Sequence, residues 1–195
     1  MDAAPHPVSR FGHVELQDMP DDLRRRIGAI TEKSGFVPNV FLALARRPAE
    51  LRAFLDYHDA LMDSDEGLSR AERELVVVAT SGANHCTYCV VAHGAILRVR
   101  SKDAEIADRV ATNPWGVELS PRERAIVDLA LLIATDSASL TEAELDDARM
   151  AGLSEEEIWD VGAITALFAM SNRLAHLTAL RPNPEFFLMG RLPRS

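Results

Sequence analysis

The stretch Asn84-His85-Cys86-Thr87-Tyr88-Cys89-Val90-Val91-Ala92-His93-Gly94 holds the only two cysteines of the 195-residue chain. If residues from Cys86 onward are helical, Cys86, Cys89 and His93 fall at i, i+3 and i+7, which is one stripe of one helix. Glu74 lies upstream, in a segment that we expect to form a separate helix. Two thiols, an imidazole and a nearby carboxylate are the components of a thiol-based redox centre with a proton relay. The sequence therefore predicts a scaffold built around this stripe.

Helix start signals recur on both sides of the cysteine stretch. Capping boxes, in which a serine or threonine is followed three residues later by glutamate, begin at Ser69, Ser120, Thr141 and Ser154. The first predicts a helix from Ser69 to about Ser81. Asn84 is a suitable N-cap for the cysteine-bearing helix, which we expect to continue to about Arg100.

The remaining segments also read as helices. We expect them over residues 21–33, 38–47, 103–112 and 155–180, with a longer one that opens at Pro48. From Val161 to Met170 the last helix is apolar almost all round, which predicts burial on several sides, by other subunits among them. The predicted fold is an all-α, single-domain helical bundle. Residues 1–19 form an extended N-terminal arm, 20–181 the helical domain and 182–195 a C-terminal tail in this interpretation.

A faint internal two-fold repeat accompanies these helices. Leu68-Ser69-x-x-Glu72-Arg73 resembles Leu119-Ser120-x-x-Glu123-Arg124 at a fixed offset. At that offset Cys86 corresponds to Ser137 and His93 to Glu144. Only the first half therefore carries the redox residues.

Composition limits the classes of function. The net charge of −9 argues against nucleic-acid binding, which usually requires basic clusters. No uncharged apolar stretch approaches the roughly 18 residues of a membrane helix, and the N-terminus lacks a signal-peptide pattern. We therefore expect a cytoplasmic protein. In that reducing compartment a cysteine pair is more often catalytic or metal-binding than a structural disulfide.

The spacing of the two thiols suits redox chemistry. The helix N-terminus favours a thiolate on Cys86 and, less strongly, on Cys89. His93, one turn beyond Cys89, can accept a proton, and Glu74 can orient His93 or take the proton in turn. A thiolate that attacks a peroxide becomes a sulfenic acid, and the second cysteine condenses with it to a disulfide. A reductant then reopens the disulfide by thiol exchange.

Other interpretations of these residues compete with this one. A zinc site could use Cys86, Cys89, His93 and His85, but four ligands from one continuous helix cannot easily surround a tetrahedral ion. Two inert buried cysteines are a further alternative. We expect no metal and no cofactor. For Tyr57, His58 and His176, and for Phe36 and Phe41, packing is the favoured role.

The residues of the motif also carry a family resemblance. The pattern Glu74-x11-Cys86-x2-Cys89-x3-His93 resembles the active-site signature of the alkyl hydroperoxidase D family, part of the carboxymuconolactone decarboxylase-like superfamily of all-helical proteins. Segments 35–41, 172–175 and 181–186 are similar to a branch described as peroxidase-related. The resemblance extends from about Leu16 to Arg191.

The resemblance implies a role for each position of the motif. Cys89 would be the peroxidatic cysteine and Cys86 the resolving one, whereas the helix N-terminus alone favours Cys86 as the more acidic thiol. His93 and Glu74 would form the proton relay. Homotrimers, or higher oligomers built from them, are also implied. Tyr88 departs from the family, which has a second histidine at that place.

The sequence thus predicts a thiol-dependent peroxidase that reduces alkyl hydroperoxides through a Cys86–Cys89 disulfide, with a Glu74/His93 proton relay. Its partners would be an organic hydroperoxide, a dithiol reductant and further copies of the chain. The alternative is a non-catalytic redox-responsive oligomer or a disulfide-exchange protein, whose cysteine pair senses oxidants.

Overall fold

The computed structural model describes residues 7–191, and these residues form α and 3-10 helices with no strand among them. The α helices are α1 (Asp21–Ser34), α2 (Asn39–Leu44), α3 (Pro48–Met62), α4 (Arg70–Ala83), α5 (Thr87–Ser101), α6 (Ile106–Thr112), α7 (Pro121–Asp136), α8 (Glu142–Met150), α9 (Glu155–Thr178) and α10 (Glu185–Leu188). Short 3-10 turns cover Leu16–Asp18, Pro114–Gly116 and Ser137–Ser139. The prediction of an all-α fold is confirmed.

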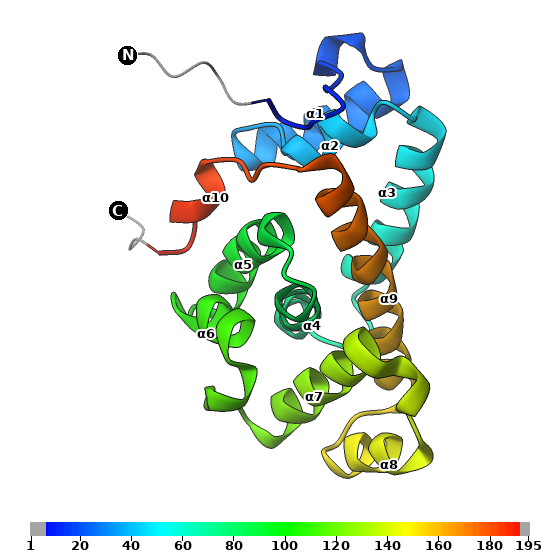
Figure 1. Ribbon diagram of the computed structural model, residues 1–195, viewed down its shortest axis with the longest axis vertical. Helices are drawn as coiled ribbons and strands as arrows, with labels where there is room; N and C mark the ends of the chain where they lie inside the picture. Colours follow the sequence, from blue (N-terminus) through cyan, green and yellow to red (C-terminus); the bar gives the residue numbers. More distant parts are fainter. Residues whose placement is uncertain (1–6, 192–195) are drawn as a thin grey trace.

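Helix α4 lies at the centre of the molecule. It packs against α5, α6, α7 and α9, and Figure 1 shows it end-on with these helices around it. Every residue from Arg73 to Ser81 is buried. A helix that is apolar on all sides is stable only when neighbours cover every face, which explains why the run Leu75–Ala79 forms the central helix.

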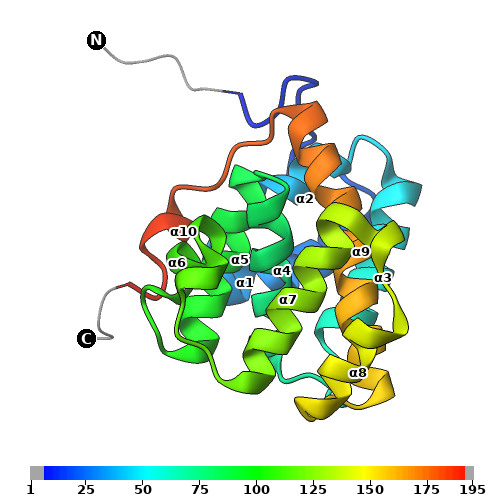
Figure 2. The same ribbon diagram turned by 60° about the horizontal axis from the view of Figure 1, so that its bottom comes forward.

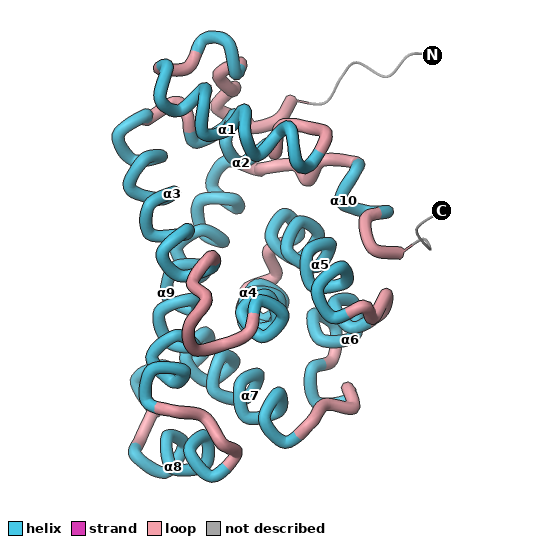
Figure 3. The backbone as a smooth tube through the Cα atoms, turned by 180° about the vertical axis from the view of Figure 1, so that it is seen from behind, coloured by secondary structure: helices cyan, strands magenta, loops and turns pink. Residues whose placement is uncertain are grey.

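Three further helices pack against the helices that surround α4. Helix α3 runs beside α9 (Figure 3), and α8 packs against α7 and α9 at one end of the molecule (Figure 2). Helix α10 docks on α5, where the Arg98 guanidinium donates to the carbonyls of Met189 and Phe186. The apolar segment after α9 is thereby held against the cysteine-bearing helix.

All four predicted capping boxes are present, with both reciprocal hydrogen bonds in each. The caps at Ser69 and Ser120 share the same backbone conformation, φ −60° and ψ 157°. Each box satisfies two backbone donors that a helix start otherwise leaves unpaired. Local sequence therefore fixes where α4, α7, α8 and α9 begin.

The internal repeat has a counterpart in side-chain contacts. Arg73 donates from Nη2 to the Glu66 carbonyl, and Arg124 donates from Nη2 to the Val117 carbonyl at 2.8 Å. Both arginines thus bind the carbonyl seven residues before them in the loop that precedes their helix. The offset between the pairs is the one that relates the two sequence segments.

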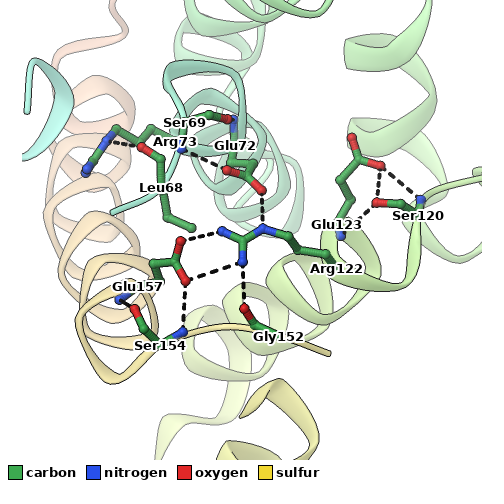
Figure 4. A network of polar contacts seen from close by, with 10 residues as sticks. All are labelled: Leu68, Ser69, Glu72, Arg73, Ser120, Arg122, Glu123, Gly152, Ser154 and Glu157. Carbon is green, nitrogen blue, oxygen red and sulfur yellow. Dashed lines mark hydrogen bonds and ion pairs between the residues drawn. The ribbon is translucent and has the colours of Figure 1, made fainter. Parts of the chain in front are cut away.

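Arg122 joins the two halves of the repeat (Figure 4). Its Nε donates to Glu72 on α4 at 2.7 Å, and its Nη1 donates to the Gly152 carbonyl at 2.9 Å. Its Nη2 pairs with Glu157 on α9. Both glutamates are also the partners of the capping boxes at Ser69 and Ser154. One arginine therefore links the starts of three helices.

Several predicted boundaries were wrong by a few residues. Helix α5 begins at Thr87, with Cys86 rather than Asn84 as its N-cap, because Asn84 ends α4 and bonds through its N–H to the Thr80 carbonyl. Helix α6 begins at Ile106 rather than near Asp103, since the Asp103 carboxylate accepts from the N–H groups of Glu105 and Ile106 before the helix starts.

Backbone hydrogen bonds hold the segment before α1 against the helical bundle. The Arg10 N–H donates to the Thr178 carbonyl and the Val14 N–H to that of Leu42. Residues 1–6 of the predicted arm and 192–195 of the predicted tail lie outside the described residues. The division into arm, domain and tail stays a prediction.

Candidate redox site

The two cysteines lie where the chain turns from α4 into α5. His85 has a positive φ of 55°, and this reverses the chain so that the Cys86 N–H bonds to the Ser81 carbonyl at 2.9 Å. Cys86 is then the N-cap of α5, and Cys89 lies in its first turn. Both thiols are free, and their residues are 0% and 2% exposed.

The pKa values of the two thiols move in opposite directions. The pKa of Cys86 falls to about 6, chiefly because the Cys89 thiol hydrogen-bonds its sulfur, with help from the Cys89 backbone N–H. The pKa of Cys89 is raised by the same hydrogen bond and by burial. One negative charge is thus shared by the pair and rests mainly on Cys86 when both are reduced.

Helix α9 supplies the polar surroundings of the sulfurs. The Asn172 side chain favours the thiolate form of both cysteines, and the Ser171 side chain favours that of Cys89, so each acts to lower the pKa of the thiol. Asn172 is fully buried; its Nδ2 donates to Ser81 Oγ and its Oδ1 accepts from Asn84, each at 3.1 Å. No sequence pattern linked Asn172 to the cysteines; it appeared only as part of a segment in the family resemblance.

His176, for which packing was the favoured role, lies near the turn that carries Cys86. Its Nε2 is 3.3 Å from the His85 carbonyl oxygen. Its charge, when protonated, favours the Cys86 thiolate and contributes to the lowered pKa of that thiol. Helix α9 therefore contributes a hydrogen-bonding amide, a hydroxyl and an imidazole to the thiol pair.

Glu74 and His93 form a second pair, as the motif predicts. Oε2 of Glu74 on α4 lies 2.8 Å from Nδ1 of His93 on α5. Their side chains are only 9% and 14% exposed. The His93 ring meets the buried Phe168 ring edge-on, with 4.6 Å between centroids. Such packing fixes the ring plane and directs Nδ1 at the carboxylate.

The structure thus assembles the four motif residues as two pairs. The two sulfurs interact with each other and with α9, while His93 bonds to α4. His93 follows Cys89 by four positions on α5, which places the two side chains on the same face, one turn apart. Helix α5 therefore contributes residues to both pairs.

Tyr88 occupies the place of the family's second histidine and has a structural contact. The Val40 N–H donates to its hydroxyl oxygen at 3.1 Å. The side chain is almost fully buried, and burial raises its pKa above the usual range. Tyr88 therefore holds the start of α2 against α5, beside the thiols.

His58 on α3 belongs to the same aromatic cluster, although the sequence favoured a packing role for it. Its ring centroid lies 6.3 Å from those of His93 and Phe168. Its Nδ1 is 3.1 Å from Oδ1 of Asp59, and that contact helps to lower the pKa of the Asp59 carboxyl. Nothing in a single sequence distinguishes such a histidine from one on a solvent-facing stripe.

Neither a metal-binding group nor a membrane-spanning helix is found in residues 7–191. In that range no three or more His, Cys, Asp or Glu side chains gather as potential metal ligands. None of its helices is both long and apolar enough to cross a bilayer.

Comparisons with known proteins place this fold and site in a family. The model of the carboxymuconolactone decarboxylase family matches the chain twice, over residues 48–114 and 104–181, which confirms the internal repeat. No curated protein sequence matches the chain significantly.

Solved structures extend the match to nearly the whole chain. An uncharacterized peroxidase-related protein from Ralstonia eutropha JMP134, described as an alkylhydroperoxidase AhpD core, is 53% identical over 97% of this chain and 100% of its own, with a TM-score of 0.95. An uncharacterized peroxidase-related protein from Silicibacter sp. TM1040 is 33% identical over 98% of this chain and 99% of its own, with a TM-score of 0.88.

A more distant structure shares the fold alone. The debrominase Bmp8 is 20% identical over 94% of this chain and 95% of its own, with a TM-score of 0.73. The family match and the two closer structures are sufficient to assign the chain. It belongs to the carboxymuconolactone decarboxylase family, in an alkylhydroperoxidase AhpD-like, peroxidase-related group.

Proposed function

We propose that the protein is a thiol-dependent peroxidase that reduces alkyl hydroperoxides through a Cys86–Cys89 disulfide. The observation that carries the proposal is the thiol pair, in which the pKa of Cys86 falls to about 6, next to a buried Glu74–His93 pair. A thiol with its usual pKa of about 8.5 is only a few per cent thiolate at neutral pH. The peroxidase-related relatives support the same class of reaction.

The proposed reaction uses two electrons from the thiol pair. A thiolate attacks one peroxide oxygen, the O–O bond breaks, and the products are a cysteine sulfenic acid and an alkoxide, which takes a proton to become the alcohol. The sulfur of the second thiol then attacks the sulfenic acid and forms the disulfide. The displaced hydroxide takes up the thiol proton and leaves as water. A dithiol reductant restores both thiols and is itself oxidised to a disulfide.

The sulfur that carries most of the negative charge is not the one to which the family resemblance assigns the attack on the peroxide. The charge rests mainly on Cys86, whereas the resemblance assigns the peroxide attack to Cys89. The two sulfurs share a hydrogen bond, so transfer of one proton from Cys89 to Cys86 moves the thiolate to Cys89. We propose that Cys89 attacks the peroxide after this transfer and that Cys86 resolves the sulfenic acid.

The Glu74–His93 pair has a defined part in this scheme. His93 lies one turn from Cys89 and presents its second ring nitrogen away from Glu74. We propose that His93 delivers the proton that the departing alkoxide needs and that Glu74 orients the ring and compensates its charge. No metal or cofactor takes part in these steps, and the functional form would be a homotrimer or a multiple of it.

Rapid kinetics of the pre-reduced protein with an alkyl hydroperoxide tests the proposal. Fast loss of two thiols per chain supports it. Cys89→Ser should abolish the reaction, whereas Cys86→Ser should lose a single thiol and stop at a sulfenic acid that a dimedone-type reagent traps. A Cys89→Ser protein that still consumes peroxide at the wild-type rate would refute the assignment of Cys89.

The full burial of both sulfurs favours one alternative, a redox-responsive oligomer that does not turn over. In that case peroxide would oxidise the thiols no faster than free cysteine, while the sedimentation coefficient would differ between the oxidised and reduced protein. Equal sedimentation of the two forms, together with slow oxidation, would exclude this alternative as well.

A further inference from the structure

An apolar groove runs between α2, α3 and α9. Its cavity volume is about 570 Å³, which lies within the roughly 300–1,000 Å³ of small-molecule sites. Its walls are mainly apolar; they include Leu51, Phe54, Tyr57, Leu167, Met170 and Leu174. Tyr57 and Met170 are 48% and 44% exposed, so large apolar side chains here face outward.

The groove leads toward the thiol pair. A second, narrow cavity shares Ala43, Leu44, Leu174 and Thr178 with it and continues to Ser171. The side chain of Ser171 also lies beside Cys89, where it favours the thiolate and so opposes the rise in the pKa of that thiol. This narrow cavity has a volume of only about 10 Å³, close to the space that one water molecule needs. Apolar chain can therefore occupy the groove, and only a small polar group can approach Cys89.

The guanidinium of Arg46 places a positive charge at the groove. Arg46 lines it, donates to the Phe11 carbonyl at 3.0 Å and lies 5.7 Å from the centroid of the Phe11 ring. Its neighbour Arg47 is neutralised by Glu50 at 2.9 Å. Within residues 7–191 no carboxylate lies within ion-pair distance of Arg46. An arginine without an acidic partner beside an apolar groove suits a ligand that has an apolar chain and an anionic head.

We propose that this groove binds the hydrocarbon chain of a long-chain carboxylate, the substrate being its hydroperoxide. The carboxylate lies near Arg46, the chain covers the apolar side chains of α3 and α9, and the hydroperoxide group points along the narrow cavity toward Ser171 and Cys89. The identity of the substrate rests on the proposed peroxidase function, whereas the binding of the chain does not. The groove thus selects amphiphilic peroxides over small ones.

Calorimetric titration of the reduced protein with dodecanoate, which carries no peroxide, tests the binding directly. Ala53 and Ala60 are both exposed on α3, but only Ala53 lines the groove. Ala53→Trp fills the groove and should weaken dodecanoate binding by at least about tenfold. Ala60→Trp is the matched control and should bind as the wild type does.

A second pair of measurements tests the head group. Arg46→Gln should weaken dodecanoate binding by about three- to fivefold, the range of an exposed ion pair, and leave the binding of dodecanol unchanged. Equal loss for both ligands would mean that Arg46 shapes the groove rather than binds the carboxylate, and would overturn that part of the proposal.

The outcomes separate this proposal from the peroxidase function. A wild-type protein that does not bind dodecanoate, or an Ala53→Trp protein that binds it normally, overturns the groove assignment whatever the peroxide kinetics show. If the wild type does not bind and Ala53→Trp lowers the sedimenting mass, the groove is instead an interface with a second copy. If dodecanoate binds in the groove but no hydroperoxide oxidises the thiols, the peroxidase function fails and the binding site stands.

Kinetics then links the groove to the thiols. Ala53→Trp should raise the KM for a long-chain carboxylate hydroperoxide at least about tenfold more than the KM for a small alkyl hydroperoxide. Equal effects on both peroxides would contradict the path from the groove to Cys89.

Discussion

Nδ1 of His93 lies 2.8 Å from Oε2 of Glu74, although the two residues are 19 positions apart and belong to different helices. The contact brings a carboxylate and an imidazole together in a site where little solvent reaches either. Buried groups of this kind keep a fixed orientation, because neither side chain has an alternative partner in water. The pair is therefore suited to hold a proton at a defined place one turn from Cys89.

Replacement of Glu74 by glutamine should slow peroxide-driven thiol oxidation. The amide can still accept the hydrogen bond of His93 but cannot balance a charge on the ring, so we expect a loss of about 100-fold, the lower end of what a positioned acid or base contributes. Rapid mixing with an alkyl hydroperoxide measures it. Glu156→Gln, an exposed change on α9, is the control. A Glu74→Gln rate equal to that of the control would exclude a role for the pair.

The lowered pKa of Cys86 predicts a pH profile. Thiolate absorbance of the reduced protein should show one titration near pH 6, and the rate of alkylation should fall as the pH drops below that value. Cys86→Ser should abolish this titration. If the titration of the wild type has its midpoint near the usual thiol pKa of about 8.5, the protein does not lower the pKa of Cys86.

The same pKa shift predicts how stability changes with pH. The folded state holds the Cys86 thiolate more tightly than the unfolded state does, so the thiol's contribution to stability is absent below about pH 6. It grows as the pH rises toward the unfolded-state value of about 8.5. Urea unfolding of the reduced wild type between these limits should show this rise, and Cys86→Ser should show less of it.

Removal of the Tyr88 hydroxyl should affect stability rather than chemistry. Tyr88→Phe leaves the part-buried Val40 N–H without its acceptor, which costs about 1–3 kcal/mol. Thiol oxidation should proceed at nearly the wild-type rate, because a phenol with a raised pKa stays protonated near neutral pH and does not relay protons. Tyr57→Phe, on an exposed tyrosine, is the matched control for urea unfolding. A large kinetic effect with unchanged stability would assign Tyr88 to the proton relay instead.

Two arginines of similar exposure, Arg122 and Arg149, should contribute differently to the free energy of unfolding. Arg122 pairs with Glu72 and Glu157, whose side chains are 16% and 15% exposed, whereas the carboxylates around Arg149 are all more than half exposed. Arg122→Ala should cost about 1–2 kcal/mol after allowance for solvent screening, and Arg149→Ala clearly less.

The acid limb of unfolding gives a second readout for Arg122. The Arg122 guanidinium holds the pKa of the Glu157 carboxyl below its usual range, so this stabilisation is lost as the pH falls through that lowered pKa. The Arg122→Ala protein should therefore lose less stability on acidification than the wild type. Equal acid sensitivity of the two proteins would contradict this.

Much of the scaffold could be predicted because its signals are local. A capping box at Ser69 or Ser154 is complete within four residues, and it fixes the start of α4 or α9 whatever the rest of the chain does. The turn before α5 was harder to predict from the sequence. Asn84 is a good N-cap in isolation, but it ends α4 and bonds to Asn172 on α9, which no local pattern reveals.

The sequence by itself determined the helical fold, the repeat and the four residues of the motif, since these follow from hydrophobic spacing, capping and the positions of two cysteines. Only the tertiary structure decided what surrounds them. Asn172 and His176 act on the thiols from α9, roughly ninety residues along the chain, and the Tyr88 hydroxyl accepts from the Val40 N–H of α2. The physical reason is that pKa values and binding grooves depend on which helix faces meet, and those faces meet only when the whole core packs around α4.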